Sequence, residues 1–281
     1  MSIRHILPII ILAVLLTALP AGADEARSTE SPAEEIACVD AGTADGGYVT
    51  VRYLGESDAA RAEVTNPEGR MTPYLLAPGE DAALSLYGGT GLYRVNIFEK
   101  TDSGQYALVF SDSFEKESEE APGPWLVSNA FVRFTEDSKC VQAARSIYDE
   151  VNGETKPFVE GVYNYVISNI AYNEKLAELV PLSYIPDPDA VMDEHVGICL
   201  DYAALMTAML RSCGVPARMI VGNFGAYYHA WVSVCMDVPE DGVIPASAWK
   251  TFDPTLGASN PAKDVQERIN RGTDYIVRYI Y

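Results

Sequence analysis

The chain has 281 residues, of which 48% are hydrophobic and 21% charged, so it is long enough for one large domain or two smaller ones with a sizeable core. Its 40 acidic residues outnumber 20 basic ones and give a net charge of -20. That balance argues against nucleic acid as a partner, because phosphate binding needs a basic surface, and it fits a well-solvated protein.

Residues 1–23 have the pattern of a secretory signal peptide. Arg4 and His5 precede an apolar run from Ile6 to Leu19, and the small residues at 21–23 resemble a cleavage site. The run is shorter than the ~20 residues that a membrane span needs. We therefore expect a cut after Ala23. The mature chain should be secreted or extracytoplasmic and should have no membrane association once the signal is removed. The alternative is an uncleaved N-terminal anchor.

The next segments predict a lead-in followed by a β domain. Residues 24–45 are acidic and alanine-rich without periodicity, which indicates a flexible lead-in. From 46 to 122, short apolar runs alternate with turn signals such as Gly88-Gly89, a pattern typical of a small all-β sandwich. The expected strands cover residues 48–53, 60–64, 73–76, 82–87, 92–98 and 106–110. No ligand of this domain is visible, and a packing or spacer role is the simplest interpretation.

Residues 123–281 predict a second, mixed domain behind an acidic linker that ends near Gly123. Residues 125–134 fit a strand or an extended connection. Apolar residues recur at helical spacing over about 140–152 and 156–169. A third helix opens at Cys199, is apolar on nearly all sides and ends at Gly214, which predicts a buried helix. Expected strands follow at 218–222, 228–234 and 249–255, and then a C-terminal helix and a strand at 275–281 that fits the edge of a sheet.

This order places a thiol at the start of a central helix and two possible partners on nearby strands. A thiol attacks well only as a thiolate, which the N–H groups and dipole of a helix N-terminus favour. His229 would take the proton of Cys199, and Asp253 would orient His229 and stabilise the imidazolium. The first N–H groups of the helix would bind the oxyanion, and Gly197 would let substrate backbone approach.

Each residue also has a simpler interpretation. A cysteine at a helix start is often a small buried hydrophobe, and Asp253-Pro254 is common turn chemistry. His195 is a competing base, although it precedes the helix and fits a solvent-facing position. A zinc site of His195, Cys199 and His229 is a further alternative that no CxxC or HExxH spacing supports.

Four sequence blocks, in order, resemble transglutaminase-like domains. The block around Cys199 covers residues 197–203, 210–211 and 214–218. The histidine block is His229-Ala230-Trp231, and the aspartate block is Asp253-Pro254-Thr255 with Trp249 upstream. The fourth block, 163–173, lies in the helix that leads into the core. Thirty residues separate Cys199 from His229 and 24 separate His229 from Asp253, as in that family. The resemblance covers about residues 135–260. Leu200 departs from the small or acidic residues of that position, which bears on substrate contacts.

The resemblance implies an α+β, cysteine-protease-like (transglutaminase-like) catalytic domain preceded by the β sandwich. It implies acyl transfer through a Cys199 thioester on a peptide or protein substrate. We expect neither cofactor nor metal, since the sequence shows no calcium-loop pattern of the EF-hand kind. Tyr172 is the candidate for completing the oxyanion hole, since no tryptophan or glutamine upstream is matched. Hydrolysis is our first expectation and protein-glutamine crosslinking or deamidation the second. A non-enzymatic exported binding or scaffold module with an inactive thiol is the third.

The chain has five cysteines, an odd number that leaves four to pair if Cys199 is a reactive thiol. Export permits disulfides, but the sequence does not assign pairs among Cys38, Cys140, Cys213 and Cys235. Cys213 and Cys235 lie in apolar patterns and also fit buried free thiols.

Overall fold

The computed structural model of the chain describes residues 36–117, 123–181, 183–240, 242–272 and 274–281. The expected signal peptide (1–23) and the first part of the expected lead-in (24–35) lie outside the described residues. Within the described ranges, no helix combines the length and apolar character that crossing a membrane would require.

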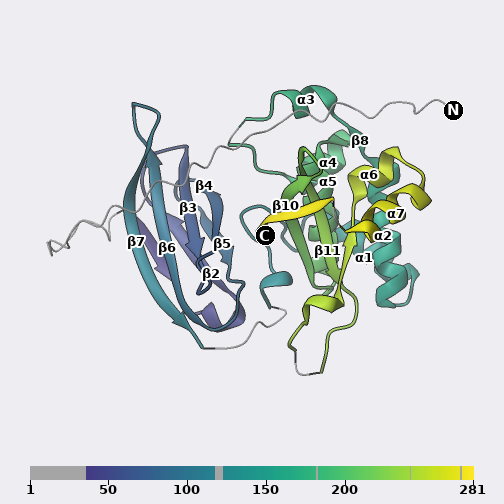
Figure 1. Ribbon diagram of the computed structural model, residues 1–281, viewed down its shortest axis with the longest axis horizontal. Coiled ribbons are helices and arrows are strands. Elements are labelled where there is room, and N and C mark those ends of the chain that lie inside the picture. The colour runs from purple at the N-terminus through teal and green to yellow at the C-terminus, as the bar shows by residue number, and fades with distance from the viewer. Residues whose placement is uncertain (1–35, 118–122, 182, 241, 273) are drawn as a thin grey trace, which may run out of the picture.

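The N-terminal part forms two packed antiparallel sheets, with strand orders β1-β2-β5 and β4-β3-β6-β7 (Figure 1). Residues alternate along the strands between buried and more exposed positions, as Ala60, Ala62 and Val64 do against Arg61 and Glu63 on β3. The expected all-β sandwich is therefore confirmed. Its strands are β1 (Ala37–Asp40), β2 (Tyr48–Tyr53), β3 (Ala60–Thr65), β4 (Met71–Leu76), β5 (Asp81–Ser85), β6 (Gly91–Lys100) and β7 (Tyr106–Lys116).

The described part of the expected lead-in is not flexible chain, and that prediction is wrong there. Ala37–Asp40 pair with β2 from Ala37↔Tyr53 to Asp40↔Thr50, and a 3-10 turn, η2, follows at Ala44–Gly46. A four-residue strand has only two positions on the inward face. Such a short segment shows no periodicity against an acidic, alanine-rich background.

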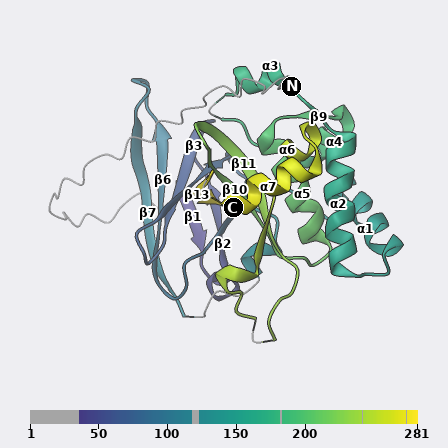
Figure 2. The ribbon, with the colours of Figure 1, turned by 45° about the vertical axis from the view of Figure 1, so that its right-hand side comes forward.

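The C-terminal part is an α+β unit built around α5 (Cys199–Ser212) and an antiparallel sheet of order β12-β11-β10-β13. Helix α5 packs on β10 and β11, and α1, α2, α4 and α6 surround it (Figure 2). The remaining elements are α1 (Lys139–Glu150), α2 (Thr155–Asn169), β8 (Ala171–Tyr172), α3 (Glu174–Glu178), α4 (Pro188–Glu194), β9 (Val196–Gly197), β10 (Ala217–Phe224), β11 (Tyr227–Cys235), η4 (Ala246–Ala248), β12 (Trp249–Phe252), α6 (Pro254–Ser259), α7 (Ala262–Arg271) and β13 (Tyr275–Ile280).

One segment differs from its expected structure, and a second resolves two alternatives. The expected third strand stops at Phe252, because the Asp253 side chain accepts a hydrogen bond from the N–H of Leu256 and Pro254 starts α6. Residues 125–134 contain no strand, which leaves the expected alternative of a connection. This segment begins at the last residue of a 3-10 turn, η3 (Gly123–Trp125), and runs between the two units.

The C-terminal strand completes the sheet as an edge strand beside β10. Gly222 permits this approach, since a Cβ at that position would collide with the carbonyl oxygen of Ile276 and lie 2.9 Å from Cη2 of Trp231. The register shifts between Val221 and Gly222, which forms a bulge at this point. The bulge and the close approach together set where Tyr275 lies.

The two units share one continuous apolar core, in which the rings of Tyr74 and Tyr281 meet edge to face at 5.3 Å. The sheet that ends in β13 lies between the sandwich and the helices in both views (Figures 1 and 2). The sandwich therefore packs directly against the unit that carries the candidate site, whereas the division of the chain at residues 122/123 stays a prediction.

Candidate active site

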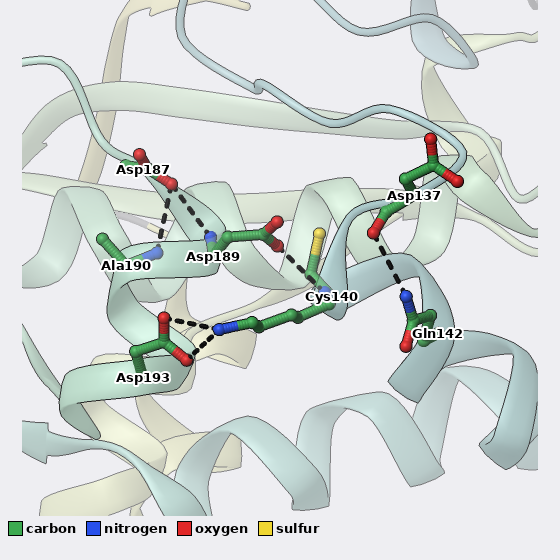
Figure 3. A network of polar contacts seen from close by, with 8 residues as sticks. Asp137, Cys140, Gln142, Asp187, Asp189, Ala190 and Asp193 are labelled. Carbon is green, nitrogen blue, oxygen red and sulfur yellow. Dashed lines mark hydrogen bonds and ion pairs between the residues drawn. The ribbon is translucent and has the colours of Figure 1, made fainter.

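The approach to the nucleophile helix is held by contacts between α1 and α4 (Figure 3). Asp187 caps α4 by accepting hydrogen bonds from the N–H groups of Asp189 and Ala190. The Asp189 carboxylate in turn accepts the N–H of Cys140 at 3.1 Å, and Lys139 pairs with Asp193. Helix α4 is thus fixed against the start of α1, and with it the turn that leads to Cys199.

A short parallel bridge and a buried carboxylate shape that turn. Strands β8 and β9 pair Tyr172 with Gly197, and Asp201 accepts a hydrogen bond from the N–H of Ile198 at 2.8 Å. Asp201 is 1% exposed and also accepts a hydrogen bond from the hydroxyl of Tyr184. A Cβ on Gly197 would lie 2.7 Å from Cβ of Asp201. Gly197 therefore makes room for the Asp201 carboxylate. This role differs from the expected one, in which the glycine lets substrate backbone approach.

Cys199 is the first residue of α5 and is partly exposed. The first N–H groups of a helix have no partner inside the helix, so they face the region around this thiol. A thiolate or an oxyanion at this point would lie at the positive end of the helix dipole.

His229 lies on β11 with its side chain fully buried, and its Nε2 is 2.9 Å from Oδ2 of Asp253. Its Nδ1 is buried without a hydrogen bond among the described groups. Burial disfavours the imidazolium, but the charge of Asp253 and its hydrogen bond, and after them the nearby Cys199, outweigh burial and raise the pKa of His229 to about 10. The imidazole is thus bonded to the carboxylate and lies near the thiol.

Asp253 is held by three donors. Its Oδ1 accepts the N–H of Leu256 at 2.9 Å, and its Oδ2 accepts both His229 and the hydroxyl of Tyr275 at 2.9 Å. Sequence reasoning missed Tyr275, which packs on Trp231 with ring centroids 5.0 Å apart. The signal that pointed there was the expected edge strand at 275–281, whose neighbour in the sheet could not be assigned from the sequence.

Tyr172 lies beside the nucleophile. Burial raises the pKa of Tyr172, and the charge of Cys199 raises it further. The centroid of the Tyr172 ring lies 6.5 Å from that of Tyr202 on α5. Its position next to Cys199 is compatible with the expected oxyanion contact, and the role itself stays a prediction.

His195 does not share this environment. It ends α4 in the left-handed conformation (φ 53°) and is exposed. The described residues contain no group of three or more histidine, cysteine, aspartate or glutamate side chains placed to hold a metal ion, so the zinc alternative of His195, Cys199 and His229 gains no support. The structure brings together Cys199, His229 and Asp253, with His195 outside.

The other cysteines are unpaired in environments that differ from that of Cys199. Burial, with Asp189 next to it, raises the pKa of Cys140 to about 12. Burial also raises the pKa of Cys213 and of Cys235, whereas Cys38 is an exposed thiol on β1. In the part of the chain that the structure describes, no histidine contributes to the raised pKa of Cys140, Cys213 or Cys235.

One family model matches the region around this site, and one relative is similar over part of the chain. Residues 135–254 match the family model described as the transglutaminase-like superfamily. The uncharacterized protein YebA of Bacillus subtilis (strain 168) is 30% identical over 127 residues, which are 37% of this chain but only 16% of YebA.

Two solved structures are similar at low identity. The periplasmic domain of TgpA from Pseudomonas aeruginosa is 19% identical with a TM-score of 0.33, over 84% of this chain and 96% of that one. Red sea bream transglutaminase is 13% identical with a TM-score of 0.30, over 74% and 48%. The matched region 135–254 contains Cys199, His229 and Asp253, and over this region the chain is similar to the transglutaminase-like superfamily.

Proposed function

We propose that this protein is an exported thiol enzyme that hydrolyses peptide or amide bonds through a thioester on Cys199. One observation carries the proposal. Cys199 opens the buried helix α5 next to His229, whose imidazole is buried and bonded through Nε2 to Asp253. This is the arrangement that activates a thiol for nucleophilic attack.

In the first half of the reaction, the proton of Cys199 passes to Nδ1 of His229, and Sγ attacks the carbonyl carbon of the substrate. The oxyanion that forms would be bound by the first N–H groups of α5, with the Tyr172 hydroxyl as an added donor. The C–N bond then breaks, and the His229 imidazolium protonates the departing amine. Asp253 holds the imidazole in orientation throughout, anchored by Leu256 and Tyr275.

In the second half, water resolves the thioester. His229 takes a proton from the water as it attacks the acyl carbon, and the thiolate leaves with the free acid as product. A primary amine in place of water would give a crosslinked or transamidated product by the same steps. Which acceptor reacts is decided by access to the thioester.

A product assay tests the proposal. The purified protein is incubated with a peptide library with and without an added primary amine, and products are identified by mass spectrometry. New carboxyl groups in both samples, absent with Cys199→Ala, are the expected result. Amine incorporation would instead assign transglutaminase activity, and deamidated glutamine side chains would assign deamidation. No product, together with an inert Cys199, would favour the scaffold module.

Export is proposed from the pattern of residues 1–23. Expression of the full chain in a bacterial host, followed by mass spectrometry of the extracytoplasmic protein, should find a mature chain that starts at Asp24. Recovery of the protein only in the cytoplasm with residues 1–23 intact would contradict export and leave the thiol chemistry untouched.

A further inference from the structure

A cavity of about 80 Å³ lies between the sandwich and the catalytic unit. Leu75 of β4 lines it from the sandwich, and Tyr281 and Tyr228 line it from the sheet of the catalytic unit. Leu200 of α5 and Val180 of the loop before α4 also line it. Both units therefore build the same cavity.

The cavity reaches the start of the nucleophile helix. Leu200, the residue after Cys199 on α5, lines it. Tyr228 precedes His229 on β11, so its side chain lies on the face of the sheet opposite to the imidazole and lines the cavity from that side. Burial and the neighbouring Tyr279 raise the pKa of Tyr228, and Cys199 adds a smaller effect in the same direction. A group bound in the cavity would thus contact the helix one residue from the reacting sulfur.

The lining is apolar and aromatic. Among the described residues that line the cavity, one side chain is charged, that of Arg61. Its guanidinium carbon lies 4.1 Å from the centroid of the Tyr106 ring. Such a lining favours a hydrocarbon group and penalises a charged or strongly polar one. The volume is about half of the ~150 Å³ cavity that accepts benzene, which favours a branched aliphatic side chain over an indole.

We propose that this cavity is a specificity pocket that receives a valine-, leucine- or isoleucine-like side chain of the substrate next to the acyl group that Cys199 attacks. The inference rests on the proposed thiol chemistry and adds a substrate class to it. It also makes the sandwich part of the substrate-binding surface. Leu200, which departs from the small or acidic residues of its family, supplies apolar surface at the junction of pocket and nucleophile.

Alkylating probes test the pocket without a known substrate. Plain iodoacetamide is compared with N-alkyl iodoacetamides that carry straight and branched groups from methyl to isoamyl, and with an N-indolylethyl probe. In each case the thiolate sulfur forms a bond to the methylene carbon and iodide leaves. The rate is followed by mass spectrometry of the Cys199 peptide, and the ratio to plain iodoacetamide isolates the contribution of the alkyl group.

Two substitutions at one position should move this ratio in opposite senses. We expect the best branched alkyl probe to react about tenfold faster than plain iodoacetamide, in line with the discrimination available to an apolar pocket. Leu75→Trp should abolish the preference by filling the pocket from the sandwich side. Leu75→Ala should shift the preference toward the larger indolylethyl probe. The matched control is Leu108→Trp, on β7 at the opposite edge of the same sheet, where the side chain is 56% exposed.

The outcomes separate the pocket from the chemistry. If plain iodoacetamide fails to modify Cys199 in preference to the other cysteines, the proposed function fails. If Cys199 reacts but the alkyl series shows no preference, or if Leu75→Trp and Leu108→Trp give the same ratio, the pocket is overturned and the nucleophile stands. Leu75→Ala keeps the test decisive should Leu75→Trp fold poorly, because an unchanged preference in that variant also overturns the pocket.

Discussion

At the scale of single residues, Tyr275 is the contact that ties the C-terminal strand to the site. Its hydroxyl donates to the same Asp253 oxygen that holds His229. Hydrogen bonds to charged groups contribute about 1.5–3 kcal/mol, so Tyr275→Phe should lower the rate of Cys199 alkylation about tenfold or more by loosening Asp253. Tyr165→Phe, on α2, is the control. Equal rates for the two variants would show that Tyr275 does not position the carboxylate.

The pKa of His229 gives a second prediction at this scale. Asp253 and Cys199 together raise it from 6.5 to about 10 against the effect of burial. In Cys199→Ala the Asp253 contribution remains, so the pKa should stay above 6.5 but fall below that of the unmodified protein. An NMR titration of the imidazole measures it, with His195→Gln to remove the other described histidine. A value at or below 6.5 in Cys199→Ala would contradict the role of Asp253.

The same shift predicts how stability varies with pH. A pKa that is raised on folding adds stability that is fully present below the unfolded value of about 6.5 and is lost as the pH rises through the folded value. The Cys199→Ala background removes the coupled thiol. In this background, the free energy of unfolding of Cys199→Ala is compared with that of the Cys199→Ala, His229→Gln double variant. The advantage of the single variant over the double variant should be smaller at about pH 9 than at about pH 6. A difference that stays constant or grows with pH would oppose the buried pair.

At the scale of elements, the site depends on β13 lying close to β10. A Cβ at position 222 would collide with the backbone of Ile276, so Gly222→Ala should push β13 outward and withdraw Tyr275 from Asp253. We expect a loss of about 2 kcal/mol in the free energy of unfolding, as for overpacked sites, and slower alkylation of Cys199. The control Gly46→Ala would place its Cβ 3.8 Å from the ring of Tyr48, an ordinary contact. Denaturant unfolding of both variants checks this, and equal stabilities would contradict it.

The elements were predictable where their pattern was long. The periodic run after Cys199 predicted a buried helix, and α5 is buried along nearly its whole length. The four-residue strand β1 was missed because it offers two inward positions, and the end of β12 was misplaced because Asp253 serves as a helix cap as well as a partner of His229. Tyr275 could not be assigned, since register between distant strands depends on packing that the sequence does not display.

At the scale of the whole molecule, Arg211 connects three parts of the chain. Its side chain is 2% exposed and donates to the carbonyls of Ala217, Val127 and Tyr281 at 2.8, 2.8 and 2.7 Å. These carbonyls belong to β10, to the segment between the two units and to the C-terminal end.

Arg211→Met should therefore destabilise the whole molecule. It leaves three carbonyls without this donor, at a cost of about 1–3 kcal/mol for each one that water cannot reach, so we expect a total loss of about 3 kcal/mol or more. The control Arg133→Met breaks an exposed pair with Glu80 and should cost about 1 kcal/mol or less. Urea unfolding measures both, and similar losses would contradict the connecting role of Arg211.

At this scale the sequence predicted the two-unit arrangement and the α+β class, and it named the three residues that the structure brings together. It did not predict that the sandwich and the catalytic unit share one core, or that Leu75 and Leu200 line the same cavity. Such contacts arise from docking between surfaces whose residues have no common spacing along the chain.

The central claim is that Cys199 is a thiol activated by His229. Its most direct test is iodoacetamide labelling at about pH 6, where an unassisted thiol is mostly protonated, followed by mass spectrometry of all five cysteines. We expect selective labelling of Cys199 over the exposed Cys38, abolished by His229→Ala. Uniform inertness of the five cysteines, or labelling of Cys199 that His229→Ala leaves unchanged, would contradict it.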